Sequence, residues 1–424
     1  MIYIGLLIVF FLEYTRPHDL LPFIVTIKLY SVLPILLFLT ASFQRSRISN
    51  AQVWSSLQAK MLIVFLLMSL LAIGLGWNRM MAQEMFTTIL GYLLLFFLVA
   101  KSIDSTERVR GLFVMLIAIH VYLIARNPDI VLSPDVRDYI QHVAFLGDGN
   151  DFALSVVIVI PMCLYIFSSS RSKVLKLLVL SIGGLLLFSI MGSQSRGATL
   201  ALGGVGIYLW TQSRRKGVGI LIGGLVVGVV LVFASDVYLS RLSTISQYEQ
   251  EGSAVGRIEA WKAAIWMANH NPVFGVGAGG FQMGHAAYHH GESKAAHSMY
   301  FHVLGEYGYV GLVMLLMFLI NAYRMIQRQI RNVNPWALRG KLEKERSLLV
   351  YMNASLIGFS IAAAFLSVFY YPHLYVMGGL CLAVNQIVDS RMKAMLEAEK
   401  AGSGASDAKA GKQVSELRLG ALQR

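Results

Sequence analysis

Three residues near the middle of the chain carry the side chains that are needed to accept a proton and to hold an anion. Arg196 lies in the stretch SQSRG, Arg257 lies in GRIEAW, and His297 directly precedes Ser298. An imidazole has an ordinary pKa of about 6.5, which suits a general base at neutral pH. Guanidinium groups bind phosphate oxygens through paired hydrogen bonds. These residue types predict a site where a base works beside a phosphate group.

Both arginines also have a structural interpretation. Arg196 precedes an apolar run, so it could anchor a helix at a membrane boundary, where an arginine is costly unless its charge reaches water or an anion. Arg257 could pair with Glu259, or it could open a helix whose N-terminal potential favours an anion. The residues alone leave these alternatives open.

Histidines are concentrated around the same segment, which raises the question of a metal site. His285 and His289 are four residues apart, a spacing that places two ligands on one helix face. The sequence lacks an HExxH motif there and offers no nearby thiolate. We therefore predict no metal and no cofactor, and we keep His289 as a possible substrate-binding residue.

A second polar stretch closes an earlier loop. Asp148, Asn150 and Asp151 could bind a divalent ion or a sugar, or they could cap the apolar helix that follows, with Asn150 or Asp151 as the N-cap. We favour the cap as the main role of this turn. Asp148 and Asp151, with Arg137 from the same loop, are held as possible substrate-binding residues.

The stretch 274–281, FGVGAGGF, resembles a glycine-rich phosphate loop only superficially. A GxGxxG pattern without a preceding strand is a weak signal. We interpret it as a tight turn that lets the backbone approach the bilayer or a lipid head group.

The elements that must position these residues are membrane helices. The chain has 424 residues, of which 56% are hydrophobic and 14% are charged, whereas soluble domains carry about 25% charged residues. Repeated apolar runs predict an all-α, polytopic membrane protein with about twelve spans. The spans are expected at roughly 1–14, 21–43, 61–77, 83–100, 110–126, 153–169, 174–192, 197–211, 217–234, 298–320, 347–370 and 373–389.

The distribution of charge predicts the orientation. Most of the 36 Lys and Arg residues lie in alternate connections and in the C-terminal tail, so these belong in the cytoplasm together with both termini. The same bias explains the net charge of +13 without nucleic acid as a partner. Of the ten histidines, only His120 lies deep inside a predicted span, and the others, including His302 and His373 at the beginnings of spans, lie on or near the external face. The external face is therefore predicted to be the working face.

Two external connections exceed the length of a turn, at 127–152 and at 235–297. Within the second, Val255–Asn269 has helical spacing, with Ile258, Trp261, Ile265 and Ala268 on one stripe, and Asn271–Pro272 should end the helix. We predict an amphipathic helix that lies on the membrane or caps a cavity. Residues 1–390 would form the transmembrane domain and 391–424 a cytoplasmic tail, with a small-residue linker that has no expected fold at 401–411.

These motifs, in this order, resemble those of the bacterial O-antigen ligase and O-antigen polymerase superfamily. The resemblance rests on SQSRG, GRIEAW, NPVFGVGAGGF and AHSMYFHVLGEYGYVG, with GDGNDFA at 147–153 similar to the ligase branch. About twelve spans with one large loop between two late spans is also that family's layout. The specific part of the match is 190–311. Ser298 departs from the pattern, because many relatives have Asn there.

The resemblance implies a GT-C-like glycosyltransferase of the bacterial inner membrane with a periplasmic active site. Such enzymes take a glycan from undecaprenyl pyrophosphate, and ligases pass it to a sugar of lipid A–core. By resemblance, His297 is the base that activates the acceptor hydroxyl, and Arg196 and Arg257 hold the donor pyrophosphate. The implied reaction is inverting and metal-independent, and its partners are the lipid-linked donor, the lipid A–core acceptor and membrane lipids.

Several other functions fit less well. Within the superfamily, an O-antigen polymerase or a protein O-glycosylation ligase would share the reaction. A transporter or flippase for a polyanionic lipid belongs to another class, and it should show charge along a pathway inside the membrane. Apart from residues at the ends of spans, Lys28 is the only Lys or Arg within a predicted span, and no internal repeat is evident. The sequence therefore favours an O-antigen ligase.

Overall fold

The structure, a computed structural model, describes residues 1–16, 29–44, 46, 48–133, 145–233, 252–291 and 293–421. Its regular elements are α-helices, with one short 3-10 helix, and the described residues contain no strand. The helices before the long connection 235–297 are α1 (Ile2–Thr15), α3 (Leu29–Phe43), α4 (Asn50–Ser55), α5 (Leu57–Leu75), α6 (Arg79–Ser102), α7 (Thr106–Arg126), α8 (Asp129–Leu132), α9 (Gly149–Ser169), α10 (Lys173–Gly192), α11 (Arg196–Gln212) and α12 (Lys216–Phe233). They are followed by α14 (Gly252–His270), α15 (Phe281–Tyr288), α16 (Met299–Leu338), α17 (Glu343–Ala362), η3 (Ala363–Phe365) and α18 (Pro372–Ala421).

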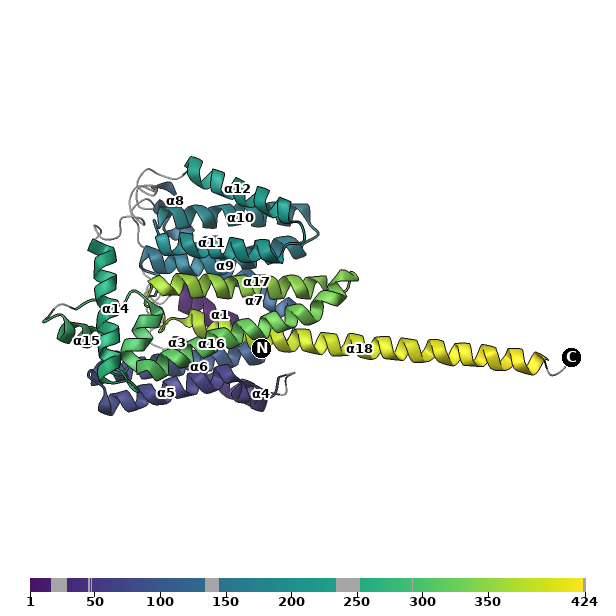
Figure 1. Cartoon of the computed structure of the whole chain (residues 1–424), viewed down its shortest axis with the longest axis horizontal. Helices are drawn as coiled ribbons and strands as arrows, with labels where there is room; N and C mark the ends of the chain where they lie inside the picture. The colour runs from purple at the N-terminus through teal and green to yellow at the C-terminus, as the bar shows by residue number, and fades with distance from the viewer. Residues whose placement is uncertain are drawn as a thin grey trace.

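The long helices run side by side in a bundle, and α14 lies across one end of it (Figure 1). We call this end the α14 face. On one side of the bundle α9 packs against α17, α10 and α11, and on the other α6 packs against α5, α3 and α18. The apolar window of α9 is 72% buried and that of α10 only 28%, so α9 is central and α10 peripheral. The windows of α17 and α16 are 67% and 61% buried, so these helices share the interior of the bundle with α9.

Seven helices within the described ranges are long and apolar enough to cross a membrane: α5, α6, α7, α9, α10, α16, and α17 with η3. Shorter apolar helices occur at Ile2–Thr15, Ser31–Phe43 and Lys216–Leu225. The predicted all-α, polytopic class is confirmed. Each of the twelve predicted spans coincides at least in part with a helix, but only seven meet the length and hydropathy required of a span, so the number twelve stays a prediction.

Polar residues between the spans start the helices. The hydroxyls of Ser56, Ser105, Ser172 and Ser195 and the side chain of Asn78 each accept a hydrogen bond from a backbone N–H in the first turn of the helix that follows. Such caps satisfy N–H groups that have no partner within the helix. They place the beginnings of these helices at defined positions in an otherwise apolar sequence.

The structure of the C-terminal tail differs from one prediction. The segment 401–411 was expected to have no fold, but α18 continues through it to Ala421 and extends beyond the bundle (Figure 1). Its small residues include no proline, and a helix that is already formed lengthens at little cost.

The packing of α9, α11 and α17 depends on Gly358. A Cβ atom at this position would lie 2.7 Å from Val157 Cγ1 and 2.9 Å from Val205 Cγ2. Both neighbours are branched at Cβ and have little rotamer freedom. There is therefore no room for a larger side chain where the three helices meet.

We predict that Gly358→Leu lowers the stability of the detergent-solubilised protein by about 1–3 kcal/mol, the usual cost of overpacking. The measurement is the midpoint of thermal unfolding. Gly184→Leu on α10 is the matched control, because a Cβ there would meet nothing within 4 Å. Equal midpoints for the two variants would show that the α9–α11–α17 contact does not require a glycine.

Candidate active site

We call the segment between α12 and α16 the insert. Its longest described helix is α14. The predicted helix Val255–Asn269 is observed as α14, Gly252–His270, and it ends before Pro272 as expected. The predicted stripe is correct at Ala268 but wrong at Ile265, which is 41% exposed; the buried stripe consists of Ala260, Ala263, Ala264, Met267 and Ala268. Small residues line the buried side because α14 packs closely on α15 and α16.

A small hydrophobic core holds the insert together. It consists of Ala263, Ala264, Met267, Val276, Phe281 and Ala296. Trp266, Tyr288 and Phe301 pack against its edge. Because these residues come from α14, α15, the connecting turns and the start of α16, the insert and the entry to α16 form one packed unit.

The turn after α14 is joined to a break in α16. At Gly308 the backbone has φ 65° and ψ −166°, which separates a short helix, Met299–Tyr307, from the long one. The N–H groups of Val276 and Gly277 donate to the carbonyls of Gly305 and Glu306 at 2.9 and 3.0 Å. The glycine-rich turn therefore caps the end of the short helix.

This pairing decides how the stretch 274–281 should be understood. Several of its N–H groups donate to acceptors of the protein itself, among them those of Val276, Gly277, Gly280 and Phe281. They are not arranged around an open phosphate site. The tight-turn interpretation is confirmed, and the expected approach to a lipid head group stays a prediction.

His297 lies at the α14 face, immediately before the short helix. Its side chain is exposed, and its φ of 47° is in the left-handed region. Trp261 of α14 fixes the neighbouring backbone, because its Nε1 donates to the carbonyl of Ala296 at 3.1 Å and its ring stacks on Phe301 at 4.9 Å. A residue in this sparsely populated conformation persists when its surroundings hold it.

Two charged residues act on the imidazole of His297. Partial desolvation lowers its pKa below the ordinary value of 6.5, the positive charge of Arg257 lowers it further, and the carboxylate of Asp148 opposes both. The structure thus brings three predicted site residues together. The lowered pKa keeps the imidazole neutral at pH 7, the form that can accept a proton.

Arg257 lies deeper in its helix than the sequence suggested. It was expected to open α14, but α14 begins at Gly252, which places Arg257 in the second turn. The potential of a helix N-terminus falls off within the first turn, so it adds little there. The carboxylate of Glu259, its expected partner in the alternative interpretation, lies 3.7 Å from Lys294 Nζ and from His289 Nε2.

Arg196 is the first residue of α11, as predicted, and it is half-buried. The hydroxyl of Ser195 caps the helix by accepting from the N–H of Ala198. Gly197 faces η3, where a Cβ would be 3.1 Å from Phe365. η3 also contacts α16, so Arg196 belongs to the same end of the bundle as His297, one element away from the start of α16.

The turn before α9 caps that helix, with a shift in the capping residue. Asp148, rather than Asn150 or Asp151, is the N-cap, and its carboxylate accepts from the N–H of Asn150 at 2.7 Å. Asp151 instead accepts from the Tyr371 hydroxyl at 3.0 Å. Asp148 can cap because its extended backbone turns the side chain back over the first turn. Arg137 lies outside the described residues.

A comparison with known families matches this part of the chain. The model of the O-antigen ligase family matches residues 181–316. We call residues 181–316 the matched segment. The resemblance found in the sequence is thereby confirmed. No curated protein matches the chain significantly.

The matched segment contains Arg196, Arg257 and His297, whereas Asp148 and Asp151 lie outside it. His289, also inside, ends α15, and its ring stacks on that of His285 with centroids 5.1 Å apart. No group of three His, Cys, Asp or Glu side chains within the described ranges is placed to hold a metal ion.

Sequence reasoning missed a buried polar network that lies mostly in the matched segment. Glu306 is 2% exposed, and its carboxylate contacts His302 Nε2 at 3.2 Å and the hydroxyl of Tyr370. The signal was available, since an acidic residue inside an apolar run marks a functional position by default. Only the lysines and arginines within spans had been considered.

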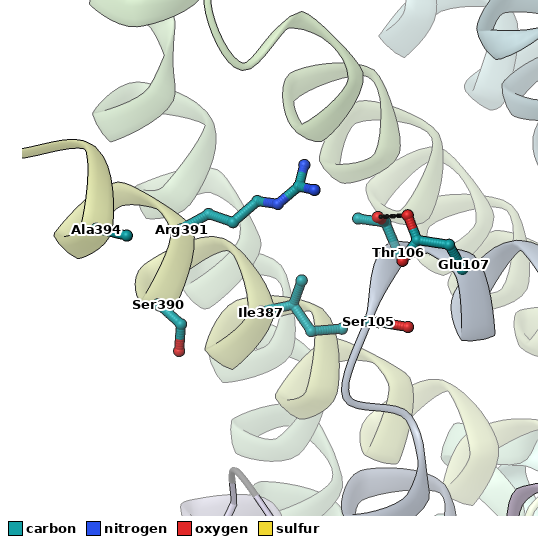
Figure 2. Close-up of a pocket in the computed structure, with 7 residues that line it drawn as sticks. All are labelled: Ser105, Thr106, Glu107, Ile387, Ser390, Arg391 and Ala394. Atoms are coloured by element: carbon teal, nitrogen blue, oxygen red, sulfur yellow. Dashed lines mark hydrogen bonds between the residues drawn. The ribbon is translucent and has the colours of Figure 1, made fainter. Parts of the chain in front are cut away.

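A pocket of about 300 Å³ lies far from this site. Figure 2 shows it between the start of α7 and the side of α18, lined by Ser105, Thr106, Glu107, Ile387, Ser390, Arg391 and Ala394. It is near the last residue of α6, whose 24 residues span about 36 Å from the α14 face. Arg391 pairs there with Glu345 of α17. The pocket is no part of the site around His297.

We predict that single substitutions move the pKa of His297 in opposite directions. Arg257→Gln should raise it, because a positive neighbour is removed, and Asp148→Asn should lower it further, because the opposing carboxylate is removed. The measurement is the pH dependence of diethyl pyrocarbonate modification of His297, which requires the neutral imidazole, followed by peptide mass spectrometry. His270 is the internal reference, because it lies about 20 Å along α14 from Arg257. Identical midpoints in both variants would contradict the assigned charges.

Proposed function

We propose that this protein is an O-antigen ligase that transfers a glycan from undecaprenyl pyrophosphate to a hydroxyl of a lipid A–core sugar. The single observation that carries the proposal is the exposed imidazole of His297, held at the end of the bundle beside Arg257 and within the segment that matches the O-antigen ligase family. The GT-C-like arrangement implied by the resemblance, the inner bacterial membrane, the cytoplasmic termini and the periplasmic α14 face are parts of this proposal.

His297 acts as the general base in the proposed reaction. It takes the proton of the acceptor hydroxyl, whose oxygen attacks the anomeric carbon of the donor sugar. The bond from that carbon to the pyrophosphate oxygen breaks, and the pyrophosphate leaves with the electron pair. A single attack inverts the configuration at the anomeric carbon. One bond forms at the anomeric carbon as another breaks, so the reaction needs no co-reactant. Pyrophosphate is itself a good leaving group.

Arg257 has two effects that support each other. Its charge lowers the pKa of His297, which keeps the base neutral, and the same charge would stabilise the anion that develops on the leaving pyrophosphate. Arg196 would contact the pyrophosphate from the start of α11. Fixed positive groups at this place can replace a metal ion in charge stabilisation.

Asp148 and Asp151 complete the proposal on the acceptor side. Both lie in the first turn of α9 or directly before it, and Asp148 is near enough to raise the pKa of His297. Carboxylates accept hydrogen bonds from sugar hydroxyls. We assign them to the acceptor sugar, with His289 as a further contact from α15 and Arg137 from the preceding loop.

A deletion strain provides the direct test. Loss of an O-antigen ligase should remove all O-antigen-capped lipopolysaccharide from the banding pattern, whereas loss of a polymerase leaves a single repeat. Complementation with His297→Ala should restore no capping, because a general base contributes about 100-fold or more to the rate. Arg196→Ala and Arg257→Ala should each lower transfer from lipid-linked donor in membranes by about 100-fold to 1,000-fold.

Two matched variants control for general effects on the protein. His270→Ala removes an exposed histidine of α14, and Arg324→Ala removes an exposed arginine of α16 far from His297. Both should complement the deletion normally. Near-normal transfer by all three site variants would refute the site, and movement of the lipid-linked glycan across liposomes without transfer would replace the ligase with a transporter.

We predict that chelation leaves the reaction intact. Membranes treated with EDTA and supplied with lipid-linked donor should transfer glycan at the rate of untreated membranes, since arginines stabilise the leaving group in this scheme. The measurement is the initial rate with and without chelator. A loss of activity that Mg²⁺ or Mn²⁺ restores would show that a divalent ion takes part.

A further inference from the structure

The glycine-rich turn does surround an anion, and that anion belongs to the protein. Glu306 Oε1 accepts a hydrogen bond from the N–H of Phe281 at 3.2 Å, and the backbone N–H of Gly279 also donates to this carboxylate. Phe281 is the first residue of α15. Backbone N–H groups of a turn and a helix start that converge on one carboxylate form the same kind of cradle that other proteins offer to a phosphate.

Two side chains also bind the same carboxylate. His302 Nε2 lies 3.2 Å from Oε1, and the Tyr370 hydroxyl donates to Oε2. The Tyr370 hydroxyl is 3.0 Å from that of Tyr307, which is 2.8 Å from Ser69 Oγ on α5. Glu306 thus connects α16, the turn 275–280, α15, the segment before α18 and α5. A buried charge is stabilised only when it is paired and hydrogen-bonded in this way.

The network and His297 lie at opposite ends of the same short helix. Glu306 is near the end of the short helix Met299–Tyr307, and His297 lies just before the beginning of that helix. A helix of nine residues spans about 13 Å and does not bend without a defect. The orientation of this short helix is set at one end by Trp261 and at the other by the contacts of Glu306.

Close backbone contacts make the arrangement intolerant of displacement. A Cβ on Gly275, whose φ is +59°, would lie 2.3 Å from the carbonyl oxygen of Gly305. A Cβ on Gly308 would lie 2.5 Å from the carbonyl oxygen of Pro272. The turn and the break in α16 fit each other only when both backbones keep these positions.

We propose that Glu306 is a positioning residue, whose buried carboxylate holds the glycine-rich turn and the short helix of α16 so that His297 faces the donor. This inference rests on the proposed function of His297 as the base. Glu306 does not touch substrate in this scheme. It acts on the reaction through the turn and through the short helix.

The test compares Glu306→Gln with the wild-type protein by two measurements. The first is amide hydrogen exchange in residues 275–281, which should become at least about 10-fold faster, since a neutral amide oxygen accepts from the N–H groups of Gly279 and Phe281 more weakly than a carboxylate does, and the amide NH2 group cannot accept from Tyr370. The second is glycan transfer, where kcat should fall by about 10-fold to 100-fold, with KM for the lipid-linked donor unchanged. Glu306→Asp keeps the charge and should recover part of both.

Glu345→Gln is the matched control. Glu345 is also a buried glutamate, 3% exposed, but it pairs with Arg391 at the other end of the bundle. This variant should lose stability without a change in the exchange of residues 275–281 or in kcat. If Glu306→Gln does not fold, Tyr370→Phe removes one donor to the carboxylate and should give the same two changes to a smaller degree.

The outcomes separate the two proposals. Unchanged exchange and unchanged kcat in Glu306→Gln, or in Tyr370→Phe if the first variant does not fold, would overturn the positioning role while leaving His297 as the base. A loss of kcat with unchanged exchange would also overturn it. Faster exchange together with full activity of His297→Ala would instead refute the proposed base. Lower kcat with unchanged KM and faster exchange would support the positioning role.

Discussion

The break of α16 at Gly308 is the constraint on which the arrangement of the α14 face depends. In an apolar medium a helix can be interrupted only if the freed backbone groups find partners, because water is not there to provide them. The partners come from the turn after α14: Pro272 accepts from the N–H of Tyr309, and Val276 and Gly277 donate to the carbonyls of the short helix. The turn and the break therefore form together.

This pairing explains why the insert is a lid and not an independent domain. Its small core takes Ala296 from the chain that enters α16, and Val276 and Phe281 from the turn that caps the short helix. Removing the bundle would leave those backbone groups without partners. Removing the insert would expose the broken end of α16. Each part supplies what the other lacks, so α14 and its Arg257 have one position relative to His297.

Much of this organisation could be predicted from the sequence, because hydropathy and helix signals are local. The apolar runs predicted the helices, Asn271–Pro272 predicted the end of α14, and the shared face of Arg257 and His297 followed from the distribution of polar residues. The register of α14 could not be predicted, because its alanines are buried by a close contact with α15 and α16. Hydrophobicity alone favoured the larger Ile265, which faces outward.

The parts that the sequence did not reveal are those that depend on distant pairs. The contacts of Glu306 are with Tyr370, 64 residues later, and with the end of the glycine-rich turn, 25 residues earlier. Asp151, which the sequence offered as a cap, instead accepts from the hydroxyl of Tyr371, 220 residues later. Residue types restrict what a side chain can bind, but the partner is set by the packing of helices that are far apart in the chain.

A polar ladder on α9 connects the proposed site with the part of the chain outside the matched segment. Below Asp148, Asp151 binds Tyr371, and one turn deeper Ser155 Oγ lies 2.7 Å from His120 Nε2 and 3.0 Å from His373 Nε2. Polar groups inside a membrane bundle are costly unless they satisfy one another, so this ladder ties α7, α9 and the start of α18 together. The ladder holds Asp151, and with it the turn of Asp148, in place on α9. Arg196, Arg257 and His297 belong to the matched segment. In the proposed reaction the donor-binding groups thus come from the matched segment, and most of the acceptor-facing groups come from outside it.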